Sequence, residues 1–203
     1  MPAAVDLSPD LTGLTAPLVY VVVFGFVFVE SGLLVGFLLP GDSLLFAAGL
    51  VAGTHGSGVS LGWLITGVLV AAVAGDSVGY AFGARLGRPW LQRRVDSGRL
   101  DPRHLRRAEE FYERFGWFAV VAARWIPWVR TFVPILAGTA RMPYRRFLLA
   151  NVTGAVAWGP TLLVLGYHAA SRPGLRVAAY VVAGTFVGAS LVVAVVGALR
   201  RRR

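Results

Sequence analysis

The chain has 203 residues, of which 56% are hydrophobic, with a mean hydropathy of +0.66 and a formal net charge of +10. This composition excludes an ordinary soluble domain and indicates an integral membrane protein, because the apolar residues form blocks long enough to cross a bilayer. All 20 basic residues are arginines that lie outside these blocks for the most part, so the charge reports orientation in a membrane rather than nucleic-acid binding. Without cysteine, the chain forms no disulfide and no thiolate metal site.

Six apolar blocks succeed one another along the chain, at residues 17–39, 44–52, 61–82, 117–140, 147–167 and 177–199. They predict a single membrane domain at 17–199, preceded by a polar N-terminal segment at 1–16 and followed by a basic tail at 200–203. Pro40-Gly41 separates the first two blocks, and a proline followed by glycine breaks a helix. We therefore expect a broken helical hairpin at this point.

The block at 61–82 and the residues after it carry a glycine at every fourth position. Gly75, Gly79, Gly83 and Gly87 line one face of a helix, where the absence of side chains lets another backbone approach closely. Tight helix packing is the expected role of this face.

The loop at about 85–116 carries nine arginines. The positive-inside rule places this loop, and the basic tail at the C-terminus, in the cytoplasm. Within the loop, Asp101-Pro102 predicts the start of a helix and Gly116 its end. This amphipathic helix fits either the cytoplasmic membrane interface or a solvated connector.

The block at 117–140 has arginines on both flanks, so both of its ends are expected in the cytoplasm. Its 24 residues are too few for two crossings, each of which needs about 20 residues. A re-entrant hairpin, interrupted by Pro127 and Pro134, satisfies both conditions.

The remaining blocks at 147–167 and 177–199 then cross outward and back. The predicted fold is an all-α membrane protein with transmembrane helices and two inverted re-entrant helical hairpins that meet near the bilayer midplane, as in many secondary transporters. The protein is expected in the cell membrane as a multi-pass protein with a cytoplasmic C-terminus. The sequence does not predict the side of the N-terminus or an oligomeric state.

The two predicted hairpins carry four charged residues inside or between their apolar blocks: Glu30, Asp42, Arg124 and Arg130. A charge at bilayer depth costs roughly 3 kcal/mol even on lenient insertion scales, so four unpaired charges would cost on the order of 10 kcal/mol. They must pair with one another, face water or hold a charged ligand. Because each hairpin is broken between its two charges, the acids and the arginines can converge in one interior ionic pocket.

The residue types suggest roles for these four side chains. Arginine stays protonated and presents a planar fork that suits phosphate, so Arg124 and Arg130 are candidates to bind an anionic headgroup. Burial favours the neutral form of a carboxylic acid, so Glu30 and Asp42 are candidates to take up and release a proton. Structural alternatives remain open: Asp42 could only cap a half-helix, and the other three could form purely structural ion pairs.

Other residues are candidates for supporting positions: Asp76, Tyr80, Asn151 and Trp158. Asp76 is expected to bond a neighbouring helix or a hairpin tip rather than substrate, and the aromatic residues more often pack than bind ligands. The three histidines are scattered without the spacing of metal ligands, so we predict no metal and no cofactor.

Several short stretches stand out between about residues 18 and 170: Glu30-Ser-Gly, Leu39-Pro-Gly-Asp-Ser-Leu44, Gly79-Tyr80 with Gly83 and Gly87, Phe115-Gly116, Arg124-Trp-Ile-Pro-Trp-Val-Arg-Thr131 through Pro134, Ala137-Gly138, Met142, Phe147, Asn151, Gly154 and Trp158. In these stretches the chain resembles the DedA family of bacterial membrane proteins, whose shared region is also called the VTT or SNARE-associated domain. One departure is Ala84, where the family usually has arginine; Arg85 is adjacent.

The resemblance implies that the acidic pair and the arginine pair are essential. It also implies a role in membrane homeostasis that depends on the proton motive force, and, for some members, the return of undecaprenyl phosphate across the cytoplasmic membrane. The leading hypothesis is therefore a non-enzymatic, proton-coupled flippase whose partners are protons and a membrane lipid or lipid phosphate. A proton-coupled transporter or antiporter of small cations or other solutes is the alternative. A lipid phosphatase ranks lower because neither hairpin contains a histidine. A non-transporting scaffold is a further alternative.

Overall fold

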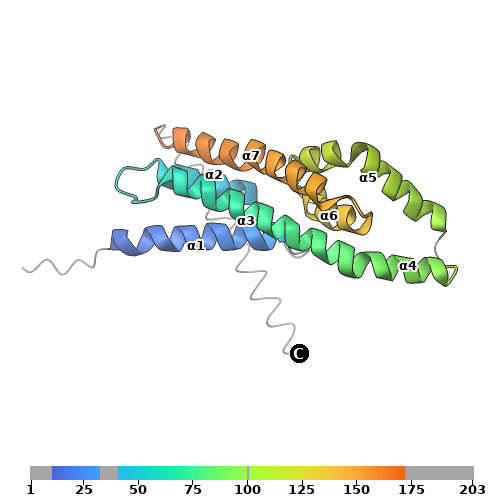
Figure 1. Cartoon of the computed structure of the whole chain (residues 1–203). Helices are drawn as coiled ribbons and strands as arrows, with labels where there is room; N and C mark the ends of the chain where they lie inside the picture. The colour runs from blue at the N-terminus through green and yellow to red at the C-terminus, as the bar shows by residue number, and fades with distance from the viewer. Residues whose placement is uncertain (1–10, 33–40, 100, 172–203) are drawn as a thin grey trace, which may run out of the picture.

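The computed structural model describes residues 11–32, 41–99 and 101–171, and this part of the chain consists of helices joined by short turns (Figure 1). The helices are α1 (Leu11–Gly32), α2 (Gly41–Ala52), α3 (Leu61–Phe82), the π-helical turn η2 (Gly83–Gly87), α4 (Arg88–Asp96), α5 (Pro102–Ala123), α6 (Pro127–Thr139) and α7 (Tyr144–Ala169). The predicted all-α fold is thereby confirmed. The predicted helix at 177–199, the tail at 200–203 and the break at Pro40 lie outside the described residues.

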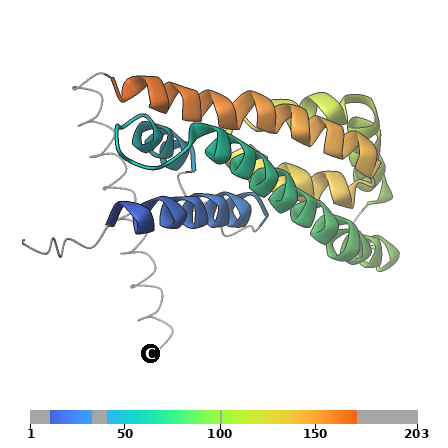
Figure 2. The same cartoon turned by 60° about the vertical axis from the view of Figure 1, so that its left-hand side comes forward.

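Within the described part of the chain, two helices are long and apolar enough to cross a membrane. One is the continuous 36-residue helix Leu61–Asp96, which joins α3, η2 and α4, and the other is the 26-residue α7. Figures 1 and 2 show α1 and α7 on opposite sides of α3. The three shorter apolar helices are Ala16–Gly32, Gly41–Ala52 and Val129–Thr139.

The shorter helices interlock with the two long ones. Helices α1 and α6 pack against α3, whereas α2 and α5 pack against α7. Each long helix therefore contacts one half of each broken pair, α1–α2 and α5–α6. This packing brings the end of α1 and the start of α2 close to the break between α5 and α6.

Glycines make the crossing of α2 and α7 close. A Cβ atom added to Gly49 would collide with the carbonyl oxygen of Leu163, and one added to Gly166 would collide with that of Phe46. The two contacts are reciprocal, since each helix supplies a glycine and a carbonyl three residues apart. Small residues that admit a neighbouring backbone are the usual basis of helix packing in membranes.

The crossing of α3 and α6 repeats this pattern. A Cβ at Gly83 would collide with the carbonyl oxygen of Ile135, and one at Gly138 with that of Tyr80. The glycine and the carbonyl are again three residues apart on each helix. Each crossing joins a helix of the N-terminal half to a helix of the C-terminal half, and the same contact occurs in both, which agrees with an internal repeat.

The predicted glycine face of α3 is confirmed. A Cβ at Gly75 would lie 2.6 Å from the carbonyl oxygen of Phe28 in α1, and one at Gly87 would lie 2.5 Å from Thr139 Oγ1 in α6. Glycine at these positions lets α1 and α6 contact the same face of the long helix.

Two predicted helix breaks are wrong. Gly116 does not end a helix, because α5 continues to Ala123 as one 22-residue helix; the missing side chain is used for packing, since a Cβ here would lie 3.1 Å from Met142 Sδ. Pro134 lies inside α6, where it packs against Gly79. A proline removes one helical hydrogen bond, yet here the helix continues through it.

Helices also occupy parts of the chain outside the apolar blocks. Helix α1 begins at Leu11, before the apolar block at 17–39. The segment at 85–116 contains α4 and the first part of α5, which begins at Pro102 as predicted.

Candidate functional site

Arg130 bridges the two acids of the first broken pair. It lies on the first turn of α6, which begins at Pro127 after an extended residue, Ile126. Its Nη1 donates to Asp42 Oδ1 at 2.8 Å, and its Nη2 pairs with Glu30 Oε1. The acids at the end of α1 and the start of α2 therefore meet an arginine that lies 88 and 100 positions away in sequence.

A glycine makes room for the Glu30 carboxylate. Glu30 is buried, and a Cβ atom added to Gly41, the first residue of α2, would collide with Glu30 Oε2. Any other residue at position 41 would therefore force the carboxylate to shift. Asp42, next to this glycine, keeps 41% of its side chain exposed, so it is the accessible acid of the pair.

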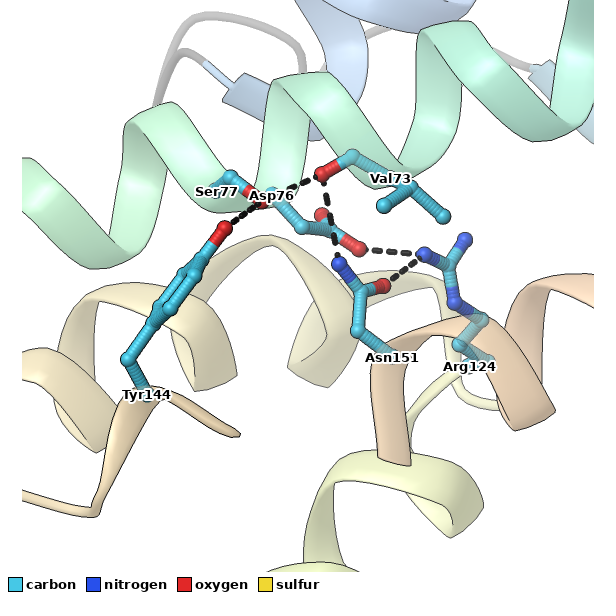
Figure 3. Close-up of polar contacts among 6 residues, drawn as sticks. All are labelled: Val73, Asp76, Ser77, Arg124, Tyr144 and Asn151. Atoms are coloured by element: carbon cyan, nitrogen blue, oxygen red, sulfur yellow. Dashed lines mark hydrogen bonds and ion pairs between the residues drawn. The ribbon is translucent and has the colours of Figure 1, made fainter. Parts of the chain in front are cut away.

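Arg124 forms a second ion pair, with Asp76 (Figure 3). It caps the C-terminus of α5, and its Nη2 donates to Asp76 Oδ2 of α3 and to Asn151 Oδ1 of α7. Asn151 Nδ2 in turn donates to the carbonyl oxygen of Val73 at 3.3 Å. All three side chains of this group are buried, so the pairing compensates charges that water does not reach.

Trp158 lies between the two arginines and so connects their ion pairs. Its Nε1 donates to Asp42 Oδ1 at 2.9 Å, and its ring centroid lies 4.7 Å from Arg130 Cζ and 5.7 Å from Arg124 Cζ. Both guanidinium groups are thus within cation–π distance of one indole. Together these residues form what we call the charge cluster: Glu30, Asp42, Asp76, Arg124, Arg130, Asn151 and Trp158.

The charge cluster contains three carboxyl groups and two guanidinium groups. If all were ionised, one negative charge would be uncompensated, and a single bound proton would balance it. Within the described residues, the buried Nε atom of Arg124 has no hydrogen-bond partner. A buried donor without a partner is uncommon in folded proteins and is a feature of binding sites.

Of the predicted site residues, Tyr80 lies elsewhere. Its hydroxyl donates to the carbonyl oxygen of Met142 at 2.5 Å, and its ring stacks on Phe147 with centroids 4.8 Å apart. It therefore anchors the turn between α6 and α7. The predicted role of Asp76, a bond to a neighbouring helix, is confirmed by its pairing with Arg124 at the end of α5.

The pairing of Arg124 with Asp76, rather than with Glu30 or Asp42, was not predicted from the sequence. Asp76 directly follows Gly75 of the α3 packing face, and this position was the sequence feature that could have indicated a buried partner for Arg124. Sequence reasoning also missed a contact beside the charge cluster, where Tyr144 hydrogen-bonds Ser77 Oγ at 3.2 Å (Figure 3).

No group of three or more acidic or histidine side chains is placed to hold a metal ion among the residues that the structure describes.

The chain is similar to known membrane proteins. The model of the VTT domain matches residues 39–168. An uncharacterized membrane protein of Mycobacterium tuberculosis is 37% identical over 174 residues, which are 86% of this chain and 76% of the relative. Protein DedA of Escherichia coli K12 is 37% identical over 155 residues, which are 76% of this chain and 70% of that protein. No solved structure matches the chain. The chain belongs to the DedA family of membrane proteins, and its VTT domain contains Asp42, Asp76, Arg124 and Arg130.

Proposed function

We propose that this protein moves a lipid phosphate across the cell membrane in exchange for, or together with, protons. A polyprenyl phosphate such as undecaprenyl phosphate, or a related phospholipid, is the expected substrate. The observation that carries the proposal is the sharing of Arg130 between Glu30 and Asp42, beside an indole ring that also faces Arg124.

Phosphate and carboxylate oxygens compete for the same guanidinium donors. Arginine binds both in the same planar geometry, often through two hydrogen bonds at once. The carboxylates of Asp42 and Asp76 occupy donors of Arg130 and Arg124, so a phosphate that enters the charge cluster takes over part of their hydrogen bonds. Asp42 is the more exposed of the two, which makes its bond to Arg130 the easier one to exchange.

Proton coupling follows from the displacement of a carboxylate by the phosphate. A carboxylate released from its arginine in an apolar interior is costly unless it is neutralised, so it takes up a proton. When the phosphate leaves, the acid returns to the arginine and releases the proton. Glu30 and Asp42 are the coupling acids in this scheme, and the apolar tail of the lipid remains in the bilayer.

The scheme needs no covalent chemistry, and we propose that the protein is not an enzyme. A phosphatase would need a nucleophile and a proton donor in reach of each other. The charge cluster instead provides binding groups and exchangeable protons.

Purified protein in liposomes tests the proposal. A fluorescent short-chain polyprenyl phosphate should exchange between leaflets faster with the protein than without it, and collapse of an imposed proton gradient should slow the exchange. Arg124→Ala and Arg130→Ala should each remove the acceleration, whereas Arg145→Ala, an exposed arginine outside the charge cluster, should retain it. Exchange that survives both cluster substitutions would reject the proposal.

A proton-coupled transporter of small cations is a second candidate, because the charge cluster has more acids than arginines. In the same liposomes, cation flux that Glu30→Gln abolishes, with no movement of lipid, would favour this function.

A further inference from the structure

A polar cavity lies away from the charge cluster, at the end of the molecule that carries α4 (right of Figure 1). Its volume is about 540 Å³. It is lined by residues of α4, α5, the α6–α7 turn and the first turn of α7: Arg88, Glu109, Glu113, Ala140, Arg141, Met142, Pro143 and Arg146. We call this site the arginine cavity. None of these residues belongs to the charge cluster.

The turn that forms one wall is held at several points. Arg141 and Met142 donate backbone hydrogen bonds to the carbonyl oxygens of Gly138 (3.2 Å) and Ala137 (3.0 Å), and the Met142 carbonyl accepts from Tyr80. Arg141 has a φ of 57°, a left-handed conformation that is unfavourable for a residue with a Cβ atom. These bonds hold the turn in that conformation, so the backbone that carries Arg141 is fixed at the cavity.

The arginines of the cavity differ in what they bind. Arg88 pairs with Glu109 and donates to the Thr139 carbonyl at 3.5 Å, and its buried Nε has no partner within the described residues. Arg141 and Arg146 are exposed and form no ion pair with any residue that the structure describes. Two guanidinium groups are therefore available to a ligand.

The start of α7 adds to the positive potential. This helix begins at Tyr144, and its N-cap residue, Pro143, supplies no side-chain hydrogen bond. The first N–H groups of a helix lack intrahelical acceptors and carry a partial positive charge. Among the residues that the structure describes, Glu113 is the one cavity carboxylate without an ion pair, since Glu109 is paired with Arg88.

We propose that the arginine cavity binds a phosphate group, with Arg141 and Arg146 as its principal ligands. Two free guanidiniums and a helix N-terminus outweigh the single carboxylate, and guanidinium groups match phosphate oxygens in geometry. The volume suits a small molecule of the size of a lipid headgroup or a sugar phosphate. The phosphate belongs either to a membrane lipid or to a soluble ester on the side that the positive-inside rule assigns to the cytoplasm.

Two binding measurements on the full chain in phosphatidylcholine nanodiscs separate these sources. In the first, glycerol 3-phosphate is titrated into the sample and the heat is measured. In the second, spin-labelled phosphatidic acid is placed in the nanodisc and its immobilised fraction is measured. Saturable binding in either experiment identifies the source, and saturable binding in neither overturns the proposal.

Variants assign the binding to the cavity. Arg141→Ala combined with Arg146→Ala should weaken it about tenfold or more, because hydrogen bonds between charged groups are the strong ones. Arg145→Ala removes one positive charge from the same turn of α7 as Arg146, but Arg145 does not line the cavity, so this variant should change the affinity by less than about twofold. Glu113→Gln removes the opposing charge and should tighten binding.

Variants also distinguish phosphate binding in the arginine cavity from binding in the charge cluster. Binding that Arg130→Ala abolishes but the Arg141/Arg146 double variant leaves intact would place the ligand in the charge cluster and overturn the proposal. Equal loss in Arg145→Ala and in the double variant would also overturn it, since only general surface charge would then be involved.

Discussion

The indole of Trp158 and the carboxylate of Asp42 share a hydrogen bond of 2.9 Å, and the acceptor is the same oxygen that binds Arg130. Asp42 is the most exposed acid of the charge cluster, with 41% of its side chain accessible. An indole N–H donor therefore fixes the position of the one acid that solvent can reach. Trp158 thus connects the long helix α7 to the accessible part of the site.

Trp158→Phe tests this role. The substitution removes the N–H donor and retains an aromatic face for the two arginines, so Asp42 should be held less firmly while the cluster stays assembled. Lipid exchange in liposomes should fall by about fivefold or more, as expected for the loss of a hydrogen bond to a charged group.

Two controls accompany this variant. The thermal unfolding midpoint of Trp158→Phe in detergent should stay close to that of the parent. Trp63→Phe changes an exposed indole on α3, and it should leave exchange unchanged. Unchanged exchange in Trp158→Phe would show that the hydrogen bond to Asp42 has no functional role.

A stability prediction concerns Arg124 and Asp76. Arg124→Leu leaves the buried carboxylate of Asp76 without its partner, and breaking such a pair from one side typically costs about 3–5 kcal/mol. Adding Asp76→Asn removes the orphaned charge, so the double variant should recover a large part of this loss. The measurement is the free energy of unfolding in mixed micelles.

The comparison with the exposed Arg145→Ala, which should change stability little, calibrates the assay. A double variant as unstable as Arg124→Leu alone would mean that the guanidinium acts through packing rather than through its charge.

Much of the charge cluster could be predicted because charges inside apolar blocks are rare and costly. That argument identified Glu30, Asp42, Arg124 and Arg130 without reference to any fold. It could not decide how they pair. Arg124 meets Asp76 because α5 packs on α7 and ends beside α3, which is a result of tertiary packing rather than of local sequence.

The helix boundaries show the same limit. Gly116 and Pro134 are local signals for a helix end, yet both lie inside helices where neighbours contact them: Met142 contacts Gly116, and Gly79 contacts Pro134. The break between α5 and α6 falls at Arg124 to Ile126, immediately before Pro127, so the proline begins the second helix rather than interrupting one. Local signals located the break between α5 and α6 to within a few residues. They were wrong at Gly116 and Pro134, where contacts with neighbouring helices keep the helix intact.

Gly41→Ala is predicted to impair function without changing any charge. The new methyl group would collide with Glu30 Oε2, so the carboxylate would have to shift from its position beside Arg130. Lipid exchange should fall toward the level of Glu30→Gln, because both variants disturb the pairing of Arg130 with this acid.

The matched control is Gly25→Ala in α1, where a Cβ meets nothing within 4 Å. That variant should exchange lipid at the parent rate. Full activity of Gly41→Ala would mean that Glu30 does not need its present position beside Arg130.

The close helix crossings lead to a final prediction. In Gly138→Ala and Gly166→Ala, the added methyl group would collide with a backbone carbonyl, of Tyr80 and of Phe46, and a backbone cannot move aside as a flexible side chain can. Both variants should lose about 1–3 kcal/mol of stability, the usual cost of overpacking. Gly25→Ala instead gains helix propensity and should be neutral or more stable by up to about 1 kcal/mol. Unfolding of the three variants in the same detergent compares them directly.

The same measurement tests the internal repeat. If the α2–α7 and α3–α6 crossings are equivalent contacts of a repeat, the two losses of stability should be similar. A loss confined to one crossing would show that the two contacts, although alike in pattern, do not contribute equally to the fold.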